Sequence, residues 1–323
     1  MRKCSVGGQA VMEGVMMRTP SGGIALAVRK PDGTIETEYR KQPTKAVKGT
    51  FLGWPVVRGV VAFVESLSVG MQTTMRSAEL FGDEESIEEP GKFEKWLAEK
   101  TGKSVMDVAM VVAVVLAVAL AVGLFVFLPS LVTQLIPWGE NTASIWKSLA
   151  EGVVRLLIFL GYLSAISLMK DIRRVYMYHG AEHKTIACYE HEDEMTPENC
   201  MKYTRLHPRC GTNYLFLVMA VSILFFAMLP YSSNFLIRFA TRLIFLPVVA
   251  GLSYEVLKLA AASDNLIARI VRAPGLGLQH LTTREPDRDM LEVALKAFEL
   301  AIHDGVLPEE QPKEAEPAEK TEA

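Results

Sequence analysis

Cysteine and net charge are both scarce in this 323-residue chain. Four cysteines are too few for a disulfide-stapled secreted fold of this length. The net charge is −3, so the chain lacks the basic excess that would hold a nucleic acid. Charged residues make up 22% of the chain and hydrophobic residues 50%, and the mean hydropathy is +0.21. This composition excludes a disordered chain and is unusually apolar for a soluble protein.

The N-terminus lacks the uninterrupted apolar stretch of a cleavable signal peptide. Arg2 and Lys3 supply a basic start, but Gly7, Gly8 and Glu13 break up the residues that follow. We therefore expect the mature protein to begin at or near Met1, on the side of the membrane where it is made.

Long apolar runs are what the chain does contain. Residues 108–128 carry no charge, and at about 1.5 Å per residue they span about 30 Å, the thickness of the hydrocarbon core. Further spans are predicted at 145–169, 214–229 and 235–257. An arrangement with three spans, in which 243–254 only re-enters the membrane, stays open. The predicted fold class is mainly α: a multi-pass helical membrane protein with about four transmembrane helices and a small N-terminal β unit.

The distribution of Lys and Arg predicts the orientation. Residues 129–145 contain none, whereas residues 170–212 contain seven. Because positive loops stay inside, both termini and the 170–212 loop should be cytoplasmic, in a bacterial cell (inner) membrane. The lipid bilayer is then the one partner that the sequence indicates, and nucleic acid is not expected.

Local signals predict the soluble parts. Runs at 24–28 and 34–39 flank a Pro-Asp-Gly turn, which is typical of a hairpin, and 7–17 is predicted as another strand. The chain is therefore divided into a β unit at 1–50, an amphipathic helix at 51–81 and a linker with a short helix at 82–104. The helix at 51–81 is either interfacial or packed on the β unit. A membrane domain at 105–258, which contains the 170–212 loop, is followed by a C-terminal helical segment at 259–304 and a disordered tail at 305–323.

Three helix ends are also predicted. The second span should continue into the cytoplasm and carry the histidines that follow it. Thr196 and Pro197 resemble an N-cap and first helical residue, and this short helix should run to about residue 207. In the C-terminal segment, 264–271 should continue the fourth span until Pro274 breaks it, before an amphipathic helix at 287–303.

Histidine and cysteine gather in the 170–212 loop. His179 and His183 are four residues apart, which places them on one face of a helix. His207 and Cys210 form a second pair, and Pro208 holds His207 out of helical geometry. One pair of imidazoles and one pair of an imidazole and a thiolate supply the nitrogen and sulfur donors that zinc prefers. The sequence therefore predicts a divalent metal, zinc in the first place, at these four residues.

Glu182 stands between the paired histidines in the pattern H-x-x-E-H, where the carboxylate of inverted zinc peptidases activates water. We therefore assign it as the candidate catalytic base. An alternative is that His179 and His183 only form hydrogen bonds near the lipid headgroups. Four protein ligands would make a metal structural, whereas three would leave a position open for catalysis.

A second cluster is predicted inside the membrane. Glu151 and Arg155 are one turn apart on the second span, and Arg238 and Arg242 are one turn apart on the fourth. Charges in a bilayer are costly and face a partner or a cavity. The cluster is either a site for an anionic headgroup or substrate, or a structural ion pair with snorkelling arginines.

Four segments resemble a known family. They read GGQAVMEGVMMR at 7–18, YHGAEHKT at 178–185, HPRCGT at 207–212, and PGL followed by LTTREP at 274–286. In this order they are similar to the YqhQ-like bacterial membrane proteins (domain of unknown function 1385). The resemblance implies a bacterial cell membrane and supports a metal at the four predicted ligands, since the family is sometimes described as predicted metal-dependent enzymes. It implies no reaction, and no role for 7–18.

Two functional hypotheses follow. The first is a zinc-dependent hydrolase at the cytoplasmic face of the membrane, with Glu182 as general base. The second is a non-catalytic membrane scaffold or sensor, in which a structural metal fastens the 170–212 loop to the β unit. A transporter would depend on the intramembrane charges alone and lacks paired repeats. The sequence identifies neither a substrate nor a protein partner.

Overall fold

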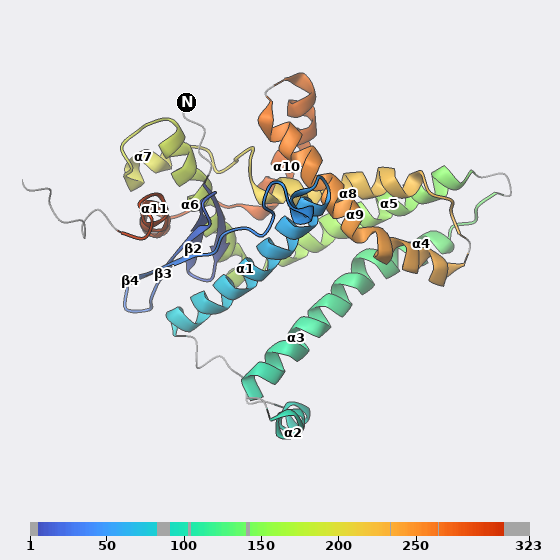
Figure 1. Cartoon of the computed structure of the whole chain (residues 1–323), viewed down its shortest axis with the longest axis horizontal. Coiled ribbons are helices and arrows are strands. Elements are labelled where there is room, and N and C mark those ends of the chain that lie inside the picture. The colour runs from blue at the N-terminus through green and yellow to red at the C-terminus, as the bar shows by residue number, and fades with distance from the viewer. Residues whose placement is uncertain are drawn as a thin grey trace, which may run out of the picture.

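The computed structural model describes residues 6–82, 91–102, 105–139, 143–232, 234–263 and 265–306. It has an α/β part at one end and a group of long helices extending away from it (Figure 1). Residues 83–90, in the predicted acidic linker, and residues 307–323, in the predicted tail, lie outside the described residues.

The predicted β unit is a four-stranded antiparallel sheet. Its strands are β1 (Gly7–Val11), β2 (Gly14–Arg18), β3 (Gly23–Arg29) and β4 (Ile35–Lys41), in the order β1-β2-β3-β4. The prediction of one strand over 7–17 was wrong, because the chain reverses within it. Val11 pairs with Gly14, and Glu13 adopts a φ of 49°, so the two residues between form a tight hairpin turn.

Helices cover both faces of this sheet. Side chains alternate along β3, so Ile24 and Leu26 point to one face and Ala25 and Ala27 to the other. Helix α1 (Val57–Phe81) covers the first face through Val69. This is the packed alternative for the predicted 51–81 helix. The other face is covered by α6 (Lys170–Glu190) and α11 (Arg288–Ile302). Burial on both faces explains why β3 reads as a continuous apolar run.

The predicted amphipathic helix at 287–303 is confirmed as α11, which buries Leu291, Ala294 and Phe298 against the sheet. Thr196 is the N-cap of α7 (Pro197–Met201), where its hydroxyl accepts a hydrogen bond from the Asn199 amide. The prediction that this helix continues to residue 207 was wrong, since it is a single turn. Two further short elements are a 3₁₀ turn (Phe51–Gly53) and α2 (Lys92–Thr101).

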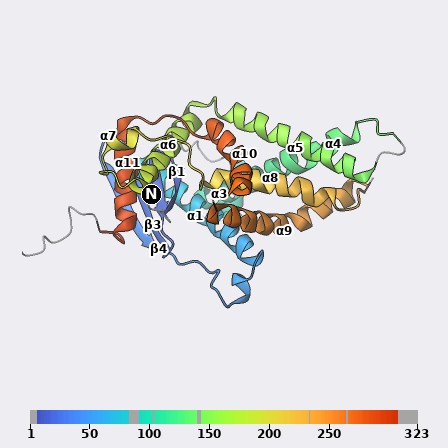
Figure 2. The same ribbon diagram turned by 90° about the horizontal axis from the view of Figure 1, so that it is seen from above.

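The long helices form the apolar part of the molecule. They are α3 (Val105–Val122), a π-helical segment (Gly123–Phe127), α4 (Leu128–Gln134), α5 (Ser144–Ile166), α8 (Gly211–Ala227), α9 (Phe235–Ala262) and α10 (Leu266–Thr282). Within the described residues, three stretches are long and apolar enough to cross a membrane, namely Val111–Gln134, Ser144–Ile166 and Phe235–Ala262. The remaining predicted span is the shorter apolar helix α8. Figure 2 shows α5, α8 and α9 running side by side.

Several predicted helix boundaries were wrong because tertiary packing tolerates proline inside a helix. The first span does not stop before Pro129 but continues to Gln134. Helix α9 passes through Pro247 without a break, so residues 243–254 belong to one continuous helix. Pro274 likewise lies inside α10. Packed neighbours can supply donors for the carbonyls that proline leaves without one.

Two helices that were predicted to be continuous are interrupted. The second span ends at Ile166 and a separate helix, α6, begins at Lys170 after Met169 adopts an extended conformation. The fourth span ends at Ala262, and α10 begins at Leu266 with Asn265 as its cap. Each break lets the chain change direction, so that α6 leaves the long helices and packs on the sheet (Figure 1).

Candidate metal centre

Helix α6 presents its two histidines because its opposite face is apolar. Tyr178, Ala181 and Ile186 are buried in the core beneath the sheet and α11. His179 and His183 lie on another face, one turn apart, with ring centroids 4.5 Å apart. The packing of α6 on the sheet thus determines where the imidazoles point.

The turn before α8 brings a thiol to these imidazoles. Cys210 is the N-cap of α8, and its Sγ lies 3.1 Å from Nε2 of His179. One ligand atom each from His179, His183 and Cys210 lies within 4.8 Å of the other two. His183 is 1% exposed and Cys210 is 9% exposed, so the three donors converge in a largely buried place.

Backbone carbonyls orient both rings. Nδ1 of His179 lies 2.8 Å from the carbonyl oxygen of Thr282, and Nδ1 of His183 lies 2.6 Å from that of Arg205. A carbonyl only accepts, so each Nδ1 carries the hydrogen and each Nε2 presents its lone pair. Histidines that bind metals have this arrangement. Nε2 of His183 is buried without a hydrogen-bond partner, and a metal ion would bind its lone pair. These residues therefore fit a zinc ion.

Burial keeps the His183 imidazole in the form that binds a cation, and hydrogen-bond donors and a helix dipole surround the thiol of Cys210. Burial lowers the pKa of His183 and so keeps its imidazole neutral. The Sγ of Cys210 accepts hydrogen bonds from the amide and hydroxyl of Thr212, at 3.4 and 3.3 Å. It also lies at the N-terminus of a 17-residue helix, where the dipole favours negative charge.

Glu182 lies next to the trio of His179, His183 and Cys210. It is 4% exposed, it accepts a hydrogen bond from the Gly8 amide, and burial raises its pKa. Its Oε2 is 4.0 Å from Nε2 of His179 and has no hydrogen-bond partner. The carboxylate therefore has one oxygen fixed by β1 and one without a hydrogen bond beside the trio.

His207, the fourth predicted ligand, lies outside the trio. Its ring centroid is 5.6 Å from that of His183, and its Nε2 is 3.5 Å from Oε2 of Glu190. Its backbone is held by Gln279, which both donates to the His207 carbonyl and accepts from its amide, each at 2.8 Å. His207 thus shapes the turn that presents Cys210 instead of pointing at the same position.

Sequence reasoning missed the residues that orient the site. Gln279 acts through its side-chain amide, and Thr282 and Arg205 act through their backbone carbonyls. A backbone carbonyl is present in every residue, so the sequence does not show which carbonyls orient the site. Gly8 was noticed as part of an unexplained motif, but only the folded sheet shows that its amide meets Glu182. Cys188 and Cys200 are free buried thiols of the core.

The predicted intramembrane charges also come together. The guanidinium of Arg242 donates to Glu151 at 2.6 Å, and those of Arg155 and Arg238 lie 3.6 Å from the same carboxylate. This cluster lies among α4, α5 and α9, at the end of the long helices away from the sheet (Figure 1).

Comparison with known proteins identifies relatives but no activity. The family described as "Protein of unknown function (DUF1385)" matches residues 54–304. The chain is also similar to the uncharacterized protein YqhQ of Bacillus subtilis (strain 168), with 33% identity over 319 residues, 95% of each chain. No solved structure gives a significant match.

Proposed function

We propose that this chain, which belongs to the DUF1385 family, is a zinc-dependent hydrolase embedded in the bacterial cell membrane. His179, His183 and Cys210 would hold the metal, and Glu182 would act as general base. The observation that carries the proposal is the convergence of two Nε2 lone pairs and one thiol within 4.8 Å. The fixing of each Nδ1 by a carbonyl supports the same ligands.

The number of converging donors favours catalysis over a purely structural role. A tetrahedral zinc ion with three protein ligands keeps one position for water, and there it would lower the pKa of that water to about 7. Glu182 has a free Oε2 at 4.0 Å from the His179 ligand atom, within reach of such a water's proton. The Gly8 amide holds the other end of the carboxylate, so the base is oriented before a substrate arrives.

A structural role is the second candidate, since the trio joins parts of the chain that are distant in sequence. Through its ligands and their carbonyl partners it links α6 to the turn at 205–210 and to the end of α10. A metal there would fasten these segments whether or not a reaction takes place. The two candidates differ in whether Glu182 is needed for function.

The role of Glu182 gives the sharpest test. Glu182→Gln keeps the size of the side chain and can still accept the hydrogen bond from Gly8, but it cannot take a proton. We expect the purified variant to retain about one zinc ion per chain, with X-ray absorption showing three protein donors and one oxygen. It should fail to complement a deletion strain, because the base is lost.

Other outcomes would decide against the hydrolase. Full complementation by Glu182→Gln with four protein donors at the metal would favour the structural role. Wild-type protein without stoichiometric metal would contradict both candidates.

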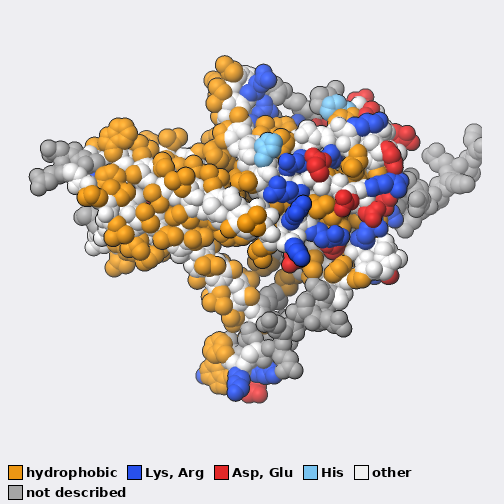
Figure 3. All heavy atoms as spheres, turned by 180° about the vertical axis from the view of Figure 1, so that it is seen from behind, with side chains coloured by type: hydrophobic (Ala, Val, Ile, Leu, Met, Phe, Trp, Pro, Cys, Tyr) orange, Lys and Arg blue, Asp and Glu red, His pale blue; other side chains and the backbone are white. Residues whose placement is uncertain are grey.

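For the membrane arrangement, we propose four spans that include α8, with both termini and residues 170–212 in the cytoplasm. The seven Lys and Arg residues at 170–212, against none at 129–145, support this orientation. The apolar side chains cover the long helices, whereas Lys, Arg, Asp and Glu gather over the sheet and α11 (Figure 3). The proposed metal centre would then lie at the cytoplasmic face. Residues 1–50 and 259–304 would belong to this cytoplasmic part and 105–258 to the membrane domain.

Reporter fusions test this orientation. A reporter inserted after residue 140 should behave as extracytoplasmic, and reporters after residue 191 and at the C-terminus as cytoplasmic. The physical reason is the cost of moving seven basic residues across the bilayer. A cytoplasmic signal at 140 would contradict the orientation and move the proposed centre to the other face.

A further inference from the structure

The buried cluster at the end of the long helices carries more positive than negative charge. Arg155, Arg238 and Arg242 are 6%, 5% and 6% exposed, and Glu151 is fully buried. Glu151 is the carboxylate in the ion pairs of all three arginines. Three guanidinium groups against one carboxylate leave an excess of two positive charges. An excess of this kind is expensive in a membrane unless an anion compensates it.

Protein atoms satisfy these guanidinium groups only in part. Arg238 donates to the carbonyls of Ser130 and Ser232 and to the Tyr231 hydroxyl. One nitrogen on each arginine is nevertheless buried without a hydrogen bond: Nη2 of Arg155 and Nε of Arg238, which lie 3.6 Å from the Glu151 carboxylate, and Nε of Arg242. A phosphate, with several acceptor oxygens, would supply the hydrogen bonds that these three donors lack.

The local fold explains why Arg155 is held there. Pro129 has no amide hydrogen, so the carbonyl of Phe125 lacks the donor that an α-helix would supply. Nε of Arg155 donates to that carbonyl at 2.8 Å. The surrounding turn, Gly123–Phe127, is a π-helical segment, a widened turn that is often found at functional sites. The sequence therefore places a charged group against a break in the first span.

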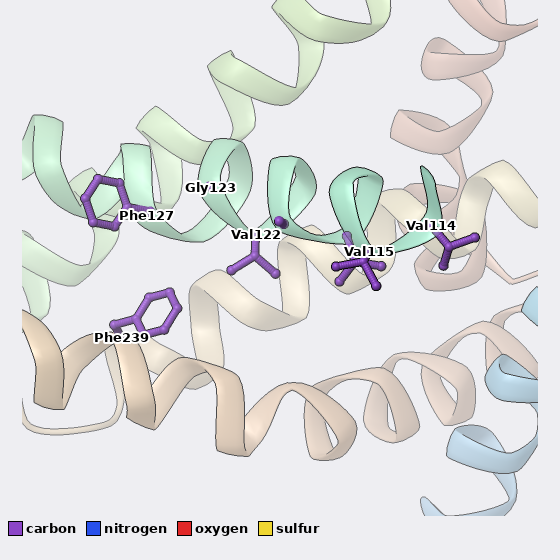
Figure 4. A pocket seen from close by; sticks show the side chains of 8 residues that line it. Val114, Val115, Val122, Gly123, Phe127 and Phe239 are labelled. Atoms are coloured by element: carbon purple, nitrogen blue, oxygen red, sulfur yellow. The ribbon is translucent and has the colours of Figure 1, made fainter. Parts of the chain in front are cut away.

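An apolar groove begins beside this cluster. It has a volume of about 570 Å³ and lies between α3 and α9 (Figure 4). Phe127 and Phe239 face each other at one end, and Val114 and Val115 lie at the other. Phe239 directly follows Arg238, and Phe127 belongs to the π-helical segment whose Phe125 carbonyl binds Arg155. Residues that are close in the chain to those of the cluster thus line this end of the groove.

The length of the groove suits a lipid tail. Residues 114–127 correspond to about 20 Å at 1.5 Å per residue, more than the roughly 15 Å of one leaflet's hydrocarbon layer. All of the lining residues are apolar or glycine, namely Val114, Val115, Val118, Ala119, Val122, Gly123, Phe127 and Phe239. An acyl chain lying in the groove would bring the phosphate to which it is attached to the end where the arginines are.

We infer that α3, α4, α5 and α9 form a binding site for one anionic phospholipid, with its phosphate at Arg155, Arg238 and Arg242 and an acyl chain in the groove between α3 and α9. Lys147 lies one turn before Glu151 on α5, with its Nζ 6.0 Å from the centre of the Tyr231 ring, and extends the positive surface towards the loop. Trp146 beside it is 64% exposed, as is typical of the membrane interface.

Lipid binding by the full-length protein tests this inference. The protein would be purified in a neutral detergent and titrated with phosphatidylglycerol or with phosphatidylcholine of identical chains, and bound lipid counted by mass spectrometry of the intact complex. We expect phosphatidylglycerol to bind with one-to-one stoichiometry and at least about tenfold more tightly, because its headgroup has a net negative charge, whereas the choline ammonium neutralises the phosphate of phosphatidylcholine. Equal binding of the two lipids would overturn the inference.

Two variants separate the headgroup from the tail. Arg238→Gln should weaken phosphatidylglycerol binding about tenfold or more and so reduce its advantage over phosphatidylcholine, whereas Arg288→Gln on the exposed face of α11 should change the binding of neither lipid. Val118→Phe fills the groove from a residue that is 57% exposed, and should weaken binding, while Val111→Phe, 55% exposed on the same helix, should not.

The test does not depend on the folding of Arg238→Gln alone. If Arg238→Gln does not fold, the pair of Val118→Phe and Val111→Phe decides the question. Equal lipid binding by these two variants would overturn the site. The last measurement is competition of lipid binding by inorganic phosphate. Competition by millimolar phosphate as effective as that by phosphatidylglycerol, without any effect of Val118→Phe, would mean a soluble anion and not a lipid.

Discussion

Replacing His183 by alanine should remove nearly all bound metal from the purified protein. The imidazole of His183 is 1% exposed, and its Nε2 is one of the three donor atoms that converge with Cys210 and His179. Loss of a residue that only supports a metal ligand costs 10–100-fold in affinity, so loss of the ligand itself should lower zinc affinity by about a hundredfold or more. Elemental analysis and a competition titration with a chromophoric chelator would measure the change.

His207 provides a matched control for this experiment. It is also a buried histidine, 7% exposed, and its ring lies beside that of His183, but its Nε2 faces Glu190. We therefore expect His207→Ala to keep a zinc content near that of wild type. Equal loss of zinc in both variants would return His207 to the ligand set, and a four-ligand site would then favour the structural role.

Gly180→Ala should destabilise the protein severely, although alanine is a better helix former than glycine. A Cβ at position 180 would lie 2.0 Å from the carbonyl oxygen of Arg284. Both groups are backbone-anchored, since the Arg284 amide donates to the Tyr176 carbonyl at 2.8 Å. The helix and the segment after α10 would have to separate. We expect a loss of about 3 kcal/mol, the upper end for overpacking, which outweighs the gain of about 1 kcal/mol in helix propensity.

The melting temperature would measure this loss, with a decrease of roughly 5–10 °C expected for a domain of this size. The separation should also weaken the bond between Nδ1 of His179 and the Thr282 carbonyl, so zinc affinity should fall together with stability. Gly277→Ala is the control, because a Cβ there meets nothing within 4 Å inside another helix. An unchanged melting temperature in Gly180→Ala would show that the two segments are not held in this close contact.

The residue types and local spacing of the site could be predicted from the sequence. Spacing alone placed His179 and His183 on one helical face, and the Pro208 turn placed Cys210 near a helix start, because both depend on local backbone geometry. It could not separate Cys210 from His207 as the donor that points at the histidines. That choice depends on Gln279, which holds the turn from α10, 72 residues away from His207.

The same division applies to the intramembrane charges. Their i, i+4 spacing predicted two charged faces, and the cost of buried charge predicted that these faces would meet. Only the arrangement of α4, α5 and α9 decided that all three arginines share the Glu151 carboxylate. It also decided that Arg155 donates to the Phe125 carbonyl, which Pro129 leaves without a backbone donor.

The sequence by itself determined the elements whose signals are local: the apolar stretches, the hairpin of β3 and β4, the amphipathic helix α11 and the cap at Thr196. Hydrophobic periodicity and capping act within a few residues, so they can be recognised without knowing the fold. The tertiary structure alone decided where helices continue or break. Pro129, Pro247 and Pro274 lie inside helices, because tertiary packing can compensate the hydrogen bond that proline removes. It also decided that α6 leaves the long helices to pack on the sheet, since burying Tyr178 and Ala181 there requires the sheet and α11 to be in place.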